Sequence, residues 1–307
     1  MMGTVTGRRI TMGAEKSYSR RIGGLWRQLL ESRKFVFGFT IVMVISLLGI
    51  VGPFVTPDPL KYNWSERGLP PLTGGHLLGT TAPWGQDVFA QLCTGIRNSL
   101  FVGILSGSLG TLIAVLLGAI GAYKGGIIDE ICNFVTNIVM VFPLYPALLI
   151  LASAVGREGR SIFLVALLIA LTSWPWAART IRSQVLSLKE REFVNLARMS
   201  GMRSREIVVE EVLPNMLAYI TMVFVLLAGG GMLAETGISL LGVGPLPQYN
   251  ITLGSMLYNC MNNSVASWRN LWWWYIPPGI VLTLLLSAIF IMHAGMDEIF
   301  NPRLRRA

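Results

Sequence analysis

Residues 98–123 read NSLFVGILSGSLGTLIAVLLGAIGAY, a largely apolar stretch without a single Asp, Glu, Lys or Arg. Roughly 20 uncharged residues in a helix are enough to cross the hydrocarbon core of a bilayer. The stretch is therefore predicted to be a transmembrane helix. Small residues recur along it, which lets a second helix approach closely where lipid removes the hydrophobic drive for packing. They are Gly110, Ala114, Gly118 and Ala122, with Gly103 and Gly107 offset before them.

Five further segments have the length and composition of bilayer-crossing helices. They cover residues 35–55, 131–155, 161–178, 216–234 and 272–293. The composition agrees, because 53% of the residues are hydrophobic and only 13% are charged, more apolar than a soluble domain of this size needs. The sequence thus predicts an all-α polytopic membrane protein with about six transmembrane helices.

The net charge of +9 does not indicate a nucleic-acid partner, because the basic residues lie between the apolar runs instead of gathering in one patch with aromatic residues. No metal site and no disulfide framework is predicted either. The cysteines at 93, 132 and 260 lack a CxxC spacing, and His76 lies far in sequence from His293.

Loops rich in Lys and Arg stay in the cytoplasm, so the flanks of the spans predict their direction. With the N-terminus inside, nineteen of the 25 basic residues fall in cytoplasmic parts and six in external parts. Both termini are therefore predicted to be cytoplasmic. The aromatic run 272–275 then falls at the outer end of the last span, where amphipathic rings prefer the membrane interface.

The chain is accordingly divided into five parts. A basic cytoplasmic segment 1–34 precedes a first anchor 35–55. An external loop 56–97 is predicted to end in a short interfacial helix over 86–96, whose apolar residues share one face. A transmembrane core 98–294 includes a polar segment 179–212, and a cytoplasmic tail 295–307 follows. Within the core, kinks are expected at Pro143, Pro146 and Pro175, since each removes a backbone donor.

The polar segment 179–212 is too charged to enter lipid, yet it is patterned as helix. Ser187 and Glu190 have the spacing of a capping box, which predicts a helix starting there. Gly201 is placed to end that helix, since glycine readily adopts the left-handed conformation of a helix C-terminus. A second short helix over 204–212 should lead to Pro214 at the start of the fifth span. The result is a helical projection on the cytoplasmic side.

At these residues the chain resembles a known family. Asn195-Leu196-Ala197, Gly201 and Leu213-Pro214-Asn215 resemble the "EAA loop" of importer-type ABC permeases, with Asn195 and Leu196 in place of the usual glutamate and first alanine. Further segments resemble the dipeptide/oligopeptide/nickel subfamily of these permeases. They are residues 76–80, 85–87, 97–100, 234–244 and 301–305, in order and with matching spacing.

The resemblance implies the importer-type ABC permease fold and a division of labour between subunits. The chain has no GxxxxGK[ST] phosphate loop, so it is not expected to be an enzyme or to bind a cofactor, and a partner ATPase would use ATP and Mg. The implied partners are a second homologous permease (a heterodimer), two cytoplasmic nucleotide-binding subunits, an extracytoplasmic substrate-binding protein and membrane lipid. The location would be a bacterial or archaeal inner membrane.

The resemblance also assigns roles to particular residues. Coupling to the ATPase would fall to Asn195, Leu196, Ala197, Gly201, Met202, Arg203 and Ser204, and the junction to the fifth span to Leu213, Pro214 and Asn215. Polar residues in or next to the spans are candidates for the translocation pathway, although interhelical hydrogen bonding is an alternative for those within a span and an interfacial carboxylate for Glu235. These are Asn133, Asn137, Thr221 and Glu235.

The expected substrates are short peptides, with oligosaccharides or nickel chelates as the alternative. A secondary transporter driven by an ion gradient is a more remote alternative. Such proteins tend to show internal repeats and intramembrane carboxylates, whereas the predicted spans have no repeat and no Asp or Glu near their centres. A membrane enzyme or scaffolding subunit is a third reading, without any nucleophile, paired-carboxylate or metal-ligand constellation to support it.

Overall fold

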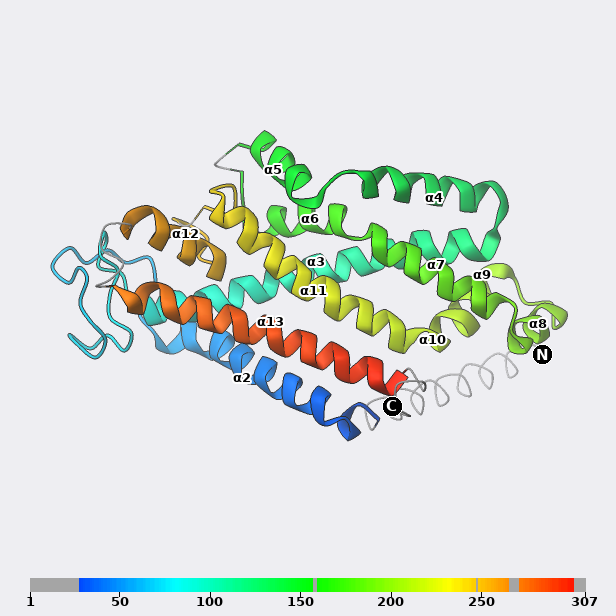
Figure 1. The fold of residues 1–307 in the computed structure, drawn as a ribbon, viewed down its shortest axis with the longest axis horizontal. Coiled ribbons are helices and arrows are strands. Elements are labelled where there is room, and N and C mark those ends of the chain that lie inside the picture. The colour runs from blue at the N-terminus through cyan, green and yellow to red at the C-terminus, as the bar shows by residue number, and fades with distance from the viewer. Residues whose placement is uncertain (1–27, 157–158, 247, 265–270, 301–307) are drawn as a thin grey trace, which may run out of the picture.

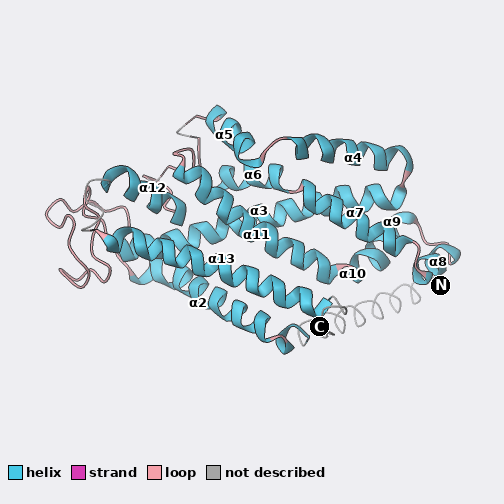
Figure 2. Ribbon diagram, viewed as in Figure 1, coloured by secondary structure: helices cyan, strands magenta, loops and turns pink. Residues whose placement is uncertain are grey.

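The computed structural model describes residues 28–156, 159–246, 248–264 and 271–300, and these ranges contain helices but no β-strands. The parts of segments 1–34 and 295–307 outside these ranges, including the motif 301–305, are not described (Figures 1 and 2). The helices are α2 (Arg33–Val55), α3 (Val88–Lys124), α4 (Gly126–Val141), α5 (Leu144–Ala154), α6 (Ile162–Ser173), α7 (Pro175–Lys189), α8 (Glu192–Met199), α9 (Ser204–Glu206), the π-helix η1 (Ile207–Val212), α10 (Leu213–Asn215), α11 (Leu217–Leu240), α12 (Leu253–Ser264) and α13 (Trp272–Phe300).

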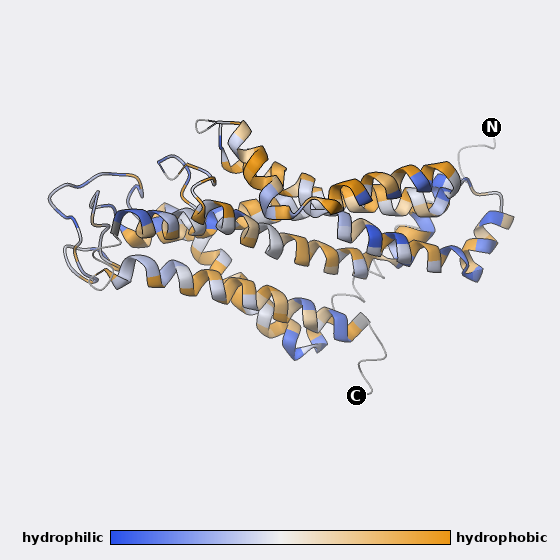
Figure 3. Cartoon of the chain, turned by 45° about the horizontal axis from the view of Figure 1, so that its top comes forward, coloured by the Kyte–Doolittle hydropathy of each residue, from blue (hydrophilic) through white to orange (hydrophobic). Residues whose placement is uncertain are grey.

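Four helices are long and apolar enough to cross a membrane: α2, α3, α11 and α13. Two further pairs, α4 with α5 and α6 with α7, reach that length only when each bent pair is taken as one span. Counted in this way, the structure has up to six spans, which confirms the predicted number. Apolar residues predominate along these helices, and hydrophilic residues gather toward the two ends of the molecule (Figure 3).

The third predicted span, 131–155, is wrong as a single helix. The chain turns by 85° between α4 and α5, much more than a kink. Phe142 and Pro143 are extended there, because Pro143 disfavours helical backbone in the residue before it and has no N–H to donate. Pro146 causes no kink, since it lies in the first turn of α5, where N–H groups have no intrahelical partner. The bend of 48° between α6 and α7 falls before Pro175, as predicted.

The predicted interfacial helix over 86–96 is also wrong. These residues form the first turns of α3, which begins after Asp87 and continues without interruption to Lys124. The Asp87 carboxylate accepts a hydrogen bond from the backbone N–H of Ala90 at 2.7 Å and so caps the helix. The apolar face that suggested contact with lipid is buried within the protein, at Val88, Leu92, Cys93 and Ile96.

The stripe of small residues on α3 makes the close helix contacts that were predicted. A Cβ added to Gly107 would lie 2.8 Å from the backbone nitrogen of Ala228 in α11. One added to Gly118 would lie 2.6 Å from the carbonyl oxygen of Ala178 in α7. Glycine thus permits backbone contact between α3 and both neighbours, and α3 is the central helix of the bundle.

The start of α2, the end of α13 and the short helices α8 to α10 lie at one end of the molecule, and α12 with the loop 56–87 lies at the other (Figure 1). Lys34 and Glu298 join α2 to α13 at the first end, 3.0 Å apart. This arrangement is compatible with the predicted topology, and which end faces the cytoplasm stays a prediction. Of the aromatic run at the start of α13, Trp272 is exposed, whereas Trp273 and Trp274 are buried inside the protein; the position of the run at the membrane interface stays a prediction.

Candidate functional site

The polar segment begins on a helix. Because α7 extends from Pro175 to Lys189, its last turns carry the first part of segment 179–212 out from the bundle. The capping box predicted at Ser187 and Glu190 is wrong, because Ser187 lies in the last turn of α7 and Glu190 terminates that helix. The next helix, α8, starts after Arg191 with no side chain capping it.

Helix α8 has one buried face and one exposed face. Val194 and Ala197 are buried in a hydrophobic cluster that includes Val185 of α7. On the opposite face, Leu196 is 63% exposed and Met199 is 85% exposed. Two large exposed apolar side chains on a short helix outside the apolar spans are typical of a surface that another protein covers.

Gly201 ends α8 as predicted, in a Schellman motif. Its φ is +78°, the left-handed region that glycine adopts without strain. The N–H of Gly201 donates to the carbonyl of Arg198 at 3.0 Å, and the N–H of Met202 donates to the carbonyl of Ala197 at 3.2 Å. The backbone N–H groups of Gly201 and Met202 therefore satisfy carbonyls of the last turn of α8, and these hydrogen bonds fix the direction of the turn.

The helix predicted over 204–212 is present, but most of it is π-helix. Helix α9, η1 and α10 follow one another from Ser204 to Asn215, and α11 starts two residues later at Leu217. The backbone N–H of Arg203 donates to the Glu206 carboxylate at 2.8 Å, which fixes the start. At the junction to α11, Leu213 and Pro214 are half-buried and Asn215 is exposed.

The segment is also attached to the end of α3. Lys189 donates to the carbonyl of Ala122 at 3.4 Å. The charged groups of Lys189 and Arg198 lie 5.8 and 5.6 Å from the centre of the Tyr123 ring, within the range of a cation–π interaction. The predicted coupling residues 195–204 thus form one compact projection, fixed to α7 by packing and to α3 by polar contacts.

The four candidate pathway residues do not come together. Asn133 donates to Asp129 within α4 at 3.1 Å, and Asn137 of α4 accepts from Arg179 of α7 at 2.8 Å. Thr221 is exposed on α11 and donates to its own helix. The sequence reasoning missed the bidentate pair of Arg182 with Asp129, at 2.8 and 2.6 Å, for which an acid in a short apolar helix beside a basic helix was the available signal.

Glu235 is buried completely, so its interpretation as an interfacial carboxylate is wrong. It lies inside α11, which runs on to Leu240, and α12 covers it. One carboxylate oxygen accepts hydrogen bonds from Ser239 and Thr252, both at 2.6 Å, and the other has no partner among the described residues. Thr252 also accepts from the N–H of Ser255 and so caps α12. Glu235 therefore ties α12 to α11.

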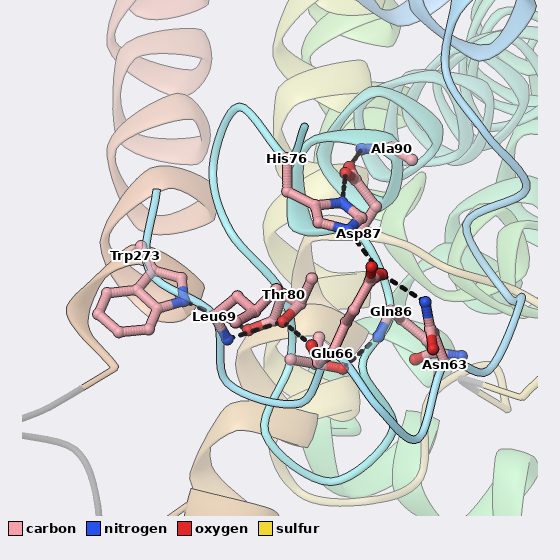
Figure 4. A network of polar contacts seen from close by, with 10 residues as sticks. Asn63, Glu66, Leu69, His76, Thr80, Gln86, Asp87, Ala90 and Trp273 are labelled. Atoms are coloured by element: carbon pink, nitrogen blue, oxygen red, sulfur yellow. Dashed lines mark hydrogen bonds and ion pairs between the residues drawn. The ribbon is translucent and has the colours of Figure 1, made fainter. Parts of the chain in front are cut away.

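The loop 56–87 is held by a network around His76, which lies between the carboxylates of Asp87 and Glu66 (Figure 4). The ring nitrogens Nδ1 and Nε2 are 2.6 Å from Asp87 and 3.2 Å from Glu66. Burial lowers the pKa of His76, but the hydrogen bonds and charges of the two carboxylates outweigh it, so the pKa lies above its ordinary value. The Nε1–H of Trp273 donates to the carbonyl of Thr80 and joins the loop to α13.

A cavity of about 240 Å³ opens between this loop, the end of α11 and α12. Its lining is aromatic and polar, including Tyr62, Trp84, Gln248, Tyr258 and Asn259. No group of three or more His, Cys, Asp or Glu side chains that could hold a metal ion occurs in the part of the chain that the structure describes.

Two family models match the chain. Residues 110–306 match the model described as "Binding-protein-dependent transport system inner membrane component", and residues 21–71 match "N-terminal TM domain of oligopeptide transport permease C".

Curated relatives align over nearly the whole chain. The oligopeptide transport system permease protein OppC of Mycobacterium tuberculosis is 31% identical over 91% of this chain and 96% of its own length. The dipeptide transport system permease protein DppC of Bacillus subtilis is 29% identical over 92% of this chain and 85% of its own length. A putative peptide permease protein of Brucella suis is 33% identical over 90% of this chain and 89% of its own length.

The family match spans more than half of the residues and agrees with the helical bundle and its long apolar spans. The chain therefore belongs to the inner membrane components of binding-protein-dependent transport systems, the permease subunits of ABC importers.

Proposed function

We propose that this chain is one of two permease subunits of an ATP-driven importer of short peptides, and that α8 with the turn at Gly201 is the surface on which the ATPase docks. The observation that carries the docking is the exposed apolar face of α8, Leu196 and Met199, on a projection outside the spans. Asn195, Arg203 and Ser204 are exposed beside it and supply polar groups at its rim.

The assembly that follows from this proposal has several subunits. A second, homologous permease would complete the translocation pathway as a heterodimer, and two cytoplasmic nucleotide-binding subunits would bind ATP and Mg. An extracytoplasmic binding protein would deliver the substrate to the end of the molecule that carries α12 and the loop 56–87. The family description, which names binding-protein-dependent transport, supports that partner. The membrane would be the inner membrane of a bacterium or archaeon.

The substrate proposal rests on the relatives. The family model at the N-terminus and the curated relatives of Mycobacterium tuberculosis and Bacillus subtilis are named for oligopeptide or dipeptide transport. The cavity between the loop 56–87, the end of α11 and α12 is lined by aromatic and amide side chains such as Tyr258 and Asn259. These side chains suit the apolar and hydrogen-bonding groups of a peptide.

The structure suggests how force would reach the spans. A displacement of α8 passes through the fixed turn at Gly201 into α9, η1 and α10, and from there into α11 without an intervening loop. Alternation between inward-open and outward-open states would then be a rigid-body motion.

The docking surface is tested by placing a charge on it. Leu196→Asp should release the ATPase during purification of the complex in mild detergent, because a carboxylate cannot be buried against an apolar groove without a partner. Leu77→Asp is the matched control, since Leu77 is 55% exposed and lies in the loop at the opposite end. Equal ATPase recovery for Leu196→Asp and wild type would refute the proposed surface. Uptake of labelled peptides by proteoliposomes tests the substrate class separately.

A further inference from the structure

A groove of about 380 Å³ lies between the last turns of α3 and the helices that follow Gly201. Its walls are apolar, with Leu116, Ala119 and Ile120 from α3 facing Val208 and Val209 from η1. The volume falls in the range of about 300 to 1,000 Å³ that is common for ligand pockets. The exposed face of α8 proposed for docking, Leu196 and Met199, does not line this groove, although Ser204 lies at the rim of both.

The rim of the groove is basic. Lys124, Arg205 and the hydroxyl of Ser204 line it where α3 ends. Neither cation forms an ion pair within the described residues. Tyr123, which also lines the groove, has the cations of Lys189 and Arg198 over its ring. Lys124 and Arg205 therefore place two positive charges at one end of the apolar groove.

The position of the groove identifies its occupant. Its α3 wall belongs to a membrane span, and Leu116 and Ile120 are exposed on the side of that span. Its basic rim lies at the end of the span, where lipid headgroups are found. An acidic protein surface would satisfy the cations but would leave the apolar walls empty. A molecule with an acyl chain and a phosphate fills both parts.

We propose that this groove binds one anionic phospholipid, with an acyl chain along Leu116, Ile120 and Val209 and the phosphate at Lys124 and Arg205. Bound there, the lipid connects η1 to the bilayer at the point where the polar segment 179–212 joins the spans. The bilayer composition would then act directly on that segment.

The site is tested on the full chain in nanodiscs of phosphatidylcholine with increasing phosphatidylglycerol, by native mass spectrometry of the lipid that stays bound. The variant Lys124→Gln/Arg205→Gln should bind phosphatidylglycerol roughly 30-fold more weakly, the effect of removing two cations close to an anionic headgroup. The control Arg33→Gln/Arg191→Gln removes two exposed charges at the same end but away from the groove, and should bind as wild type does.

A second variant tests the apolar part without touching the charges. Val209→Trp should fill the groove and lower lipid binding, because Val209 is 53% exposed and can be enlarged without disturbing the core. Circular dichroism and thermal unfolding confirm that each variant is folded. Unchanged phosphatidylglycerol binding in the double variant, equal affinity for phosphatidylcholine, or complete competition by inorganic phosphate would each overturn the proposal. The proposal would also be overturned if Lys124→Gln/Arg205→Gln lost the bound ATPase and kept its affinity for phosphatidylglycerol.

Discussion

Replacing Gly201 gives a direct test of the turn between α8 and α9. A Cβ at this position meets no atom within 4 Å, so alanine brings no clash and its cost is that of the backbone conformation alone. For an L-residue the left-handed region costs about 1–2 kcal/mol. Gly201→Ala should therefore lower the equilibrium constant between the structured and the unstructured turn about 5- to 30-fold. Gly201→Pro should abolish the turn, because proline cannot adopt φ of +78° and has no N–H to donate to Arg198.

The assay is ATP-driven peptide uptake by proteoliposomes that contain the complete importer, measured together with ATP hydrolysis. Gly201→Ala should reduce the peptide transported per ATP, because a less populated turn transmits motion less often. Gly201→Asn should lie between alanine and wild type, since asparagine tolerates the left-handed conformation better than other side chains. Gly201→Pro should leave the chain in the membrane without coupled uptake.

The matched control is Gly156→Ala. Gly156 has φ of +75° and open space around its Cβ position, so the same substitution has the same local cost. It follows α5 and is remote from α8 in the fold. Normal uptake by Gly201→Pro, or an equal loss with Gly156→Ala, would refute the role of the turn in coupling.

Three further predictions concern stability. Because the pKa of His76 is raised, the stabilising contribution of the protonated ring is complete below pH 6.5, the ordinary pKa of histidine, and is lost as the pH rises through the raised pKa. Thermal unfolding should show this pH dependence, and His76→Gln should remove it. Gly107→Ala should destabilise the chain by about 1–3 kcal/mol through overpacking against α11. Gly230→Ala is the control, because a Cβ added there meets no atom within 4 Å, and it should be neutral or slightly stabilising in the same unfolding assay. Thr252→Val should lower the free energy of unfolding by about 1 kcal/mol or more, because it removes the cap of α12 and a hydrogen bond to a buried carboxylate. Thr283 is exposed on α13, so Thr283→Val should change the midpoint of denaturation little.

The features that could be predicted from the sequence are those with a local cause. Apolar length alone identified the segments that become α2, α3, α11 and α13. The four-residue spacing of Gly110, Ala114 and Gly118 identified the packed face of α3, because one stripe of a helix can face only one side. Gly201 was recognised as a helix terminator, since the left-handed conformation is a local preference of glycine.

The predictions that failed depended on tertiary contacts. The apolar face of residues 86–96 was assigned to lipid, but the buried face of a helix inside a protein has the same pattern. For Glu235 the sequence suggests a pathway residue, with an interfacial carboxylate as the alternative, because it does not show that α12 folds over α11 and supplies Thr252 as a partner. The spacing of Ser187 and Glu190 suited a capping box, but α7 continued through it, since packing decides where a helix ends when local signals are weak.

The packing of α3 limits how the proposed importer could move. Gly107 and Gly118 bring the backbone of α3 into contact with α11 and α7, so these three helices cannot slide past one another without clashes. The polar segment 179–212 is fixed to the same unit. Val194 and Ala197 are buried in its core, and Lys189 donates a hydrogen bond to Ala122 at the end of α3. A closely packed unit of this kind moves as one body. Under the proposed function, the motion between inward-open and outward-open states would therefore occur at the edges of this unit. The bend between α4 and α5 is one such edge, because its two arms are joined by two residues with extended backbone.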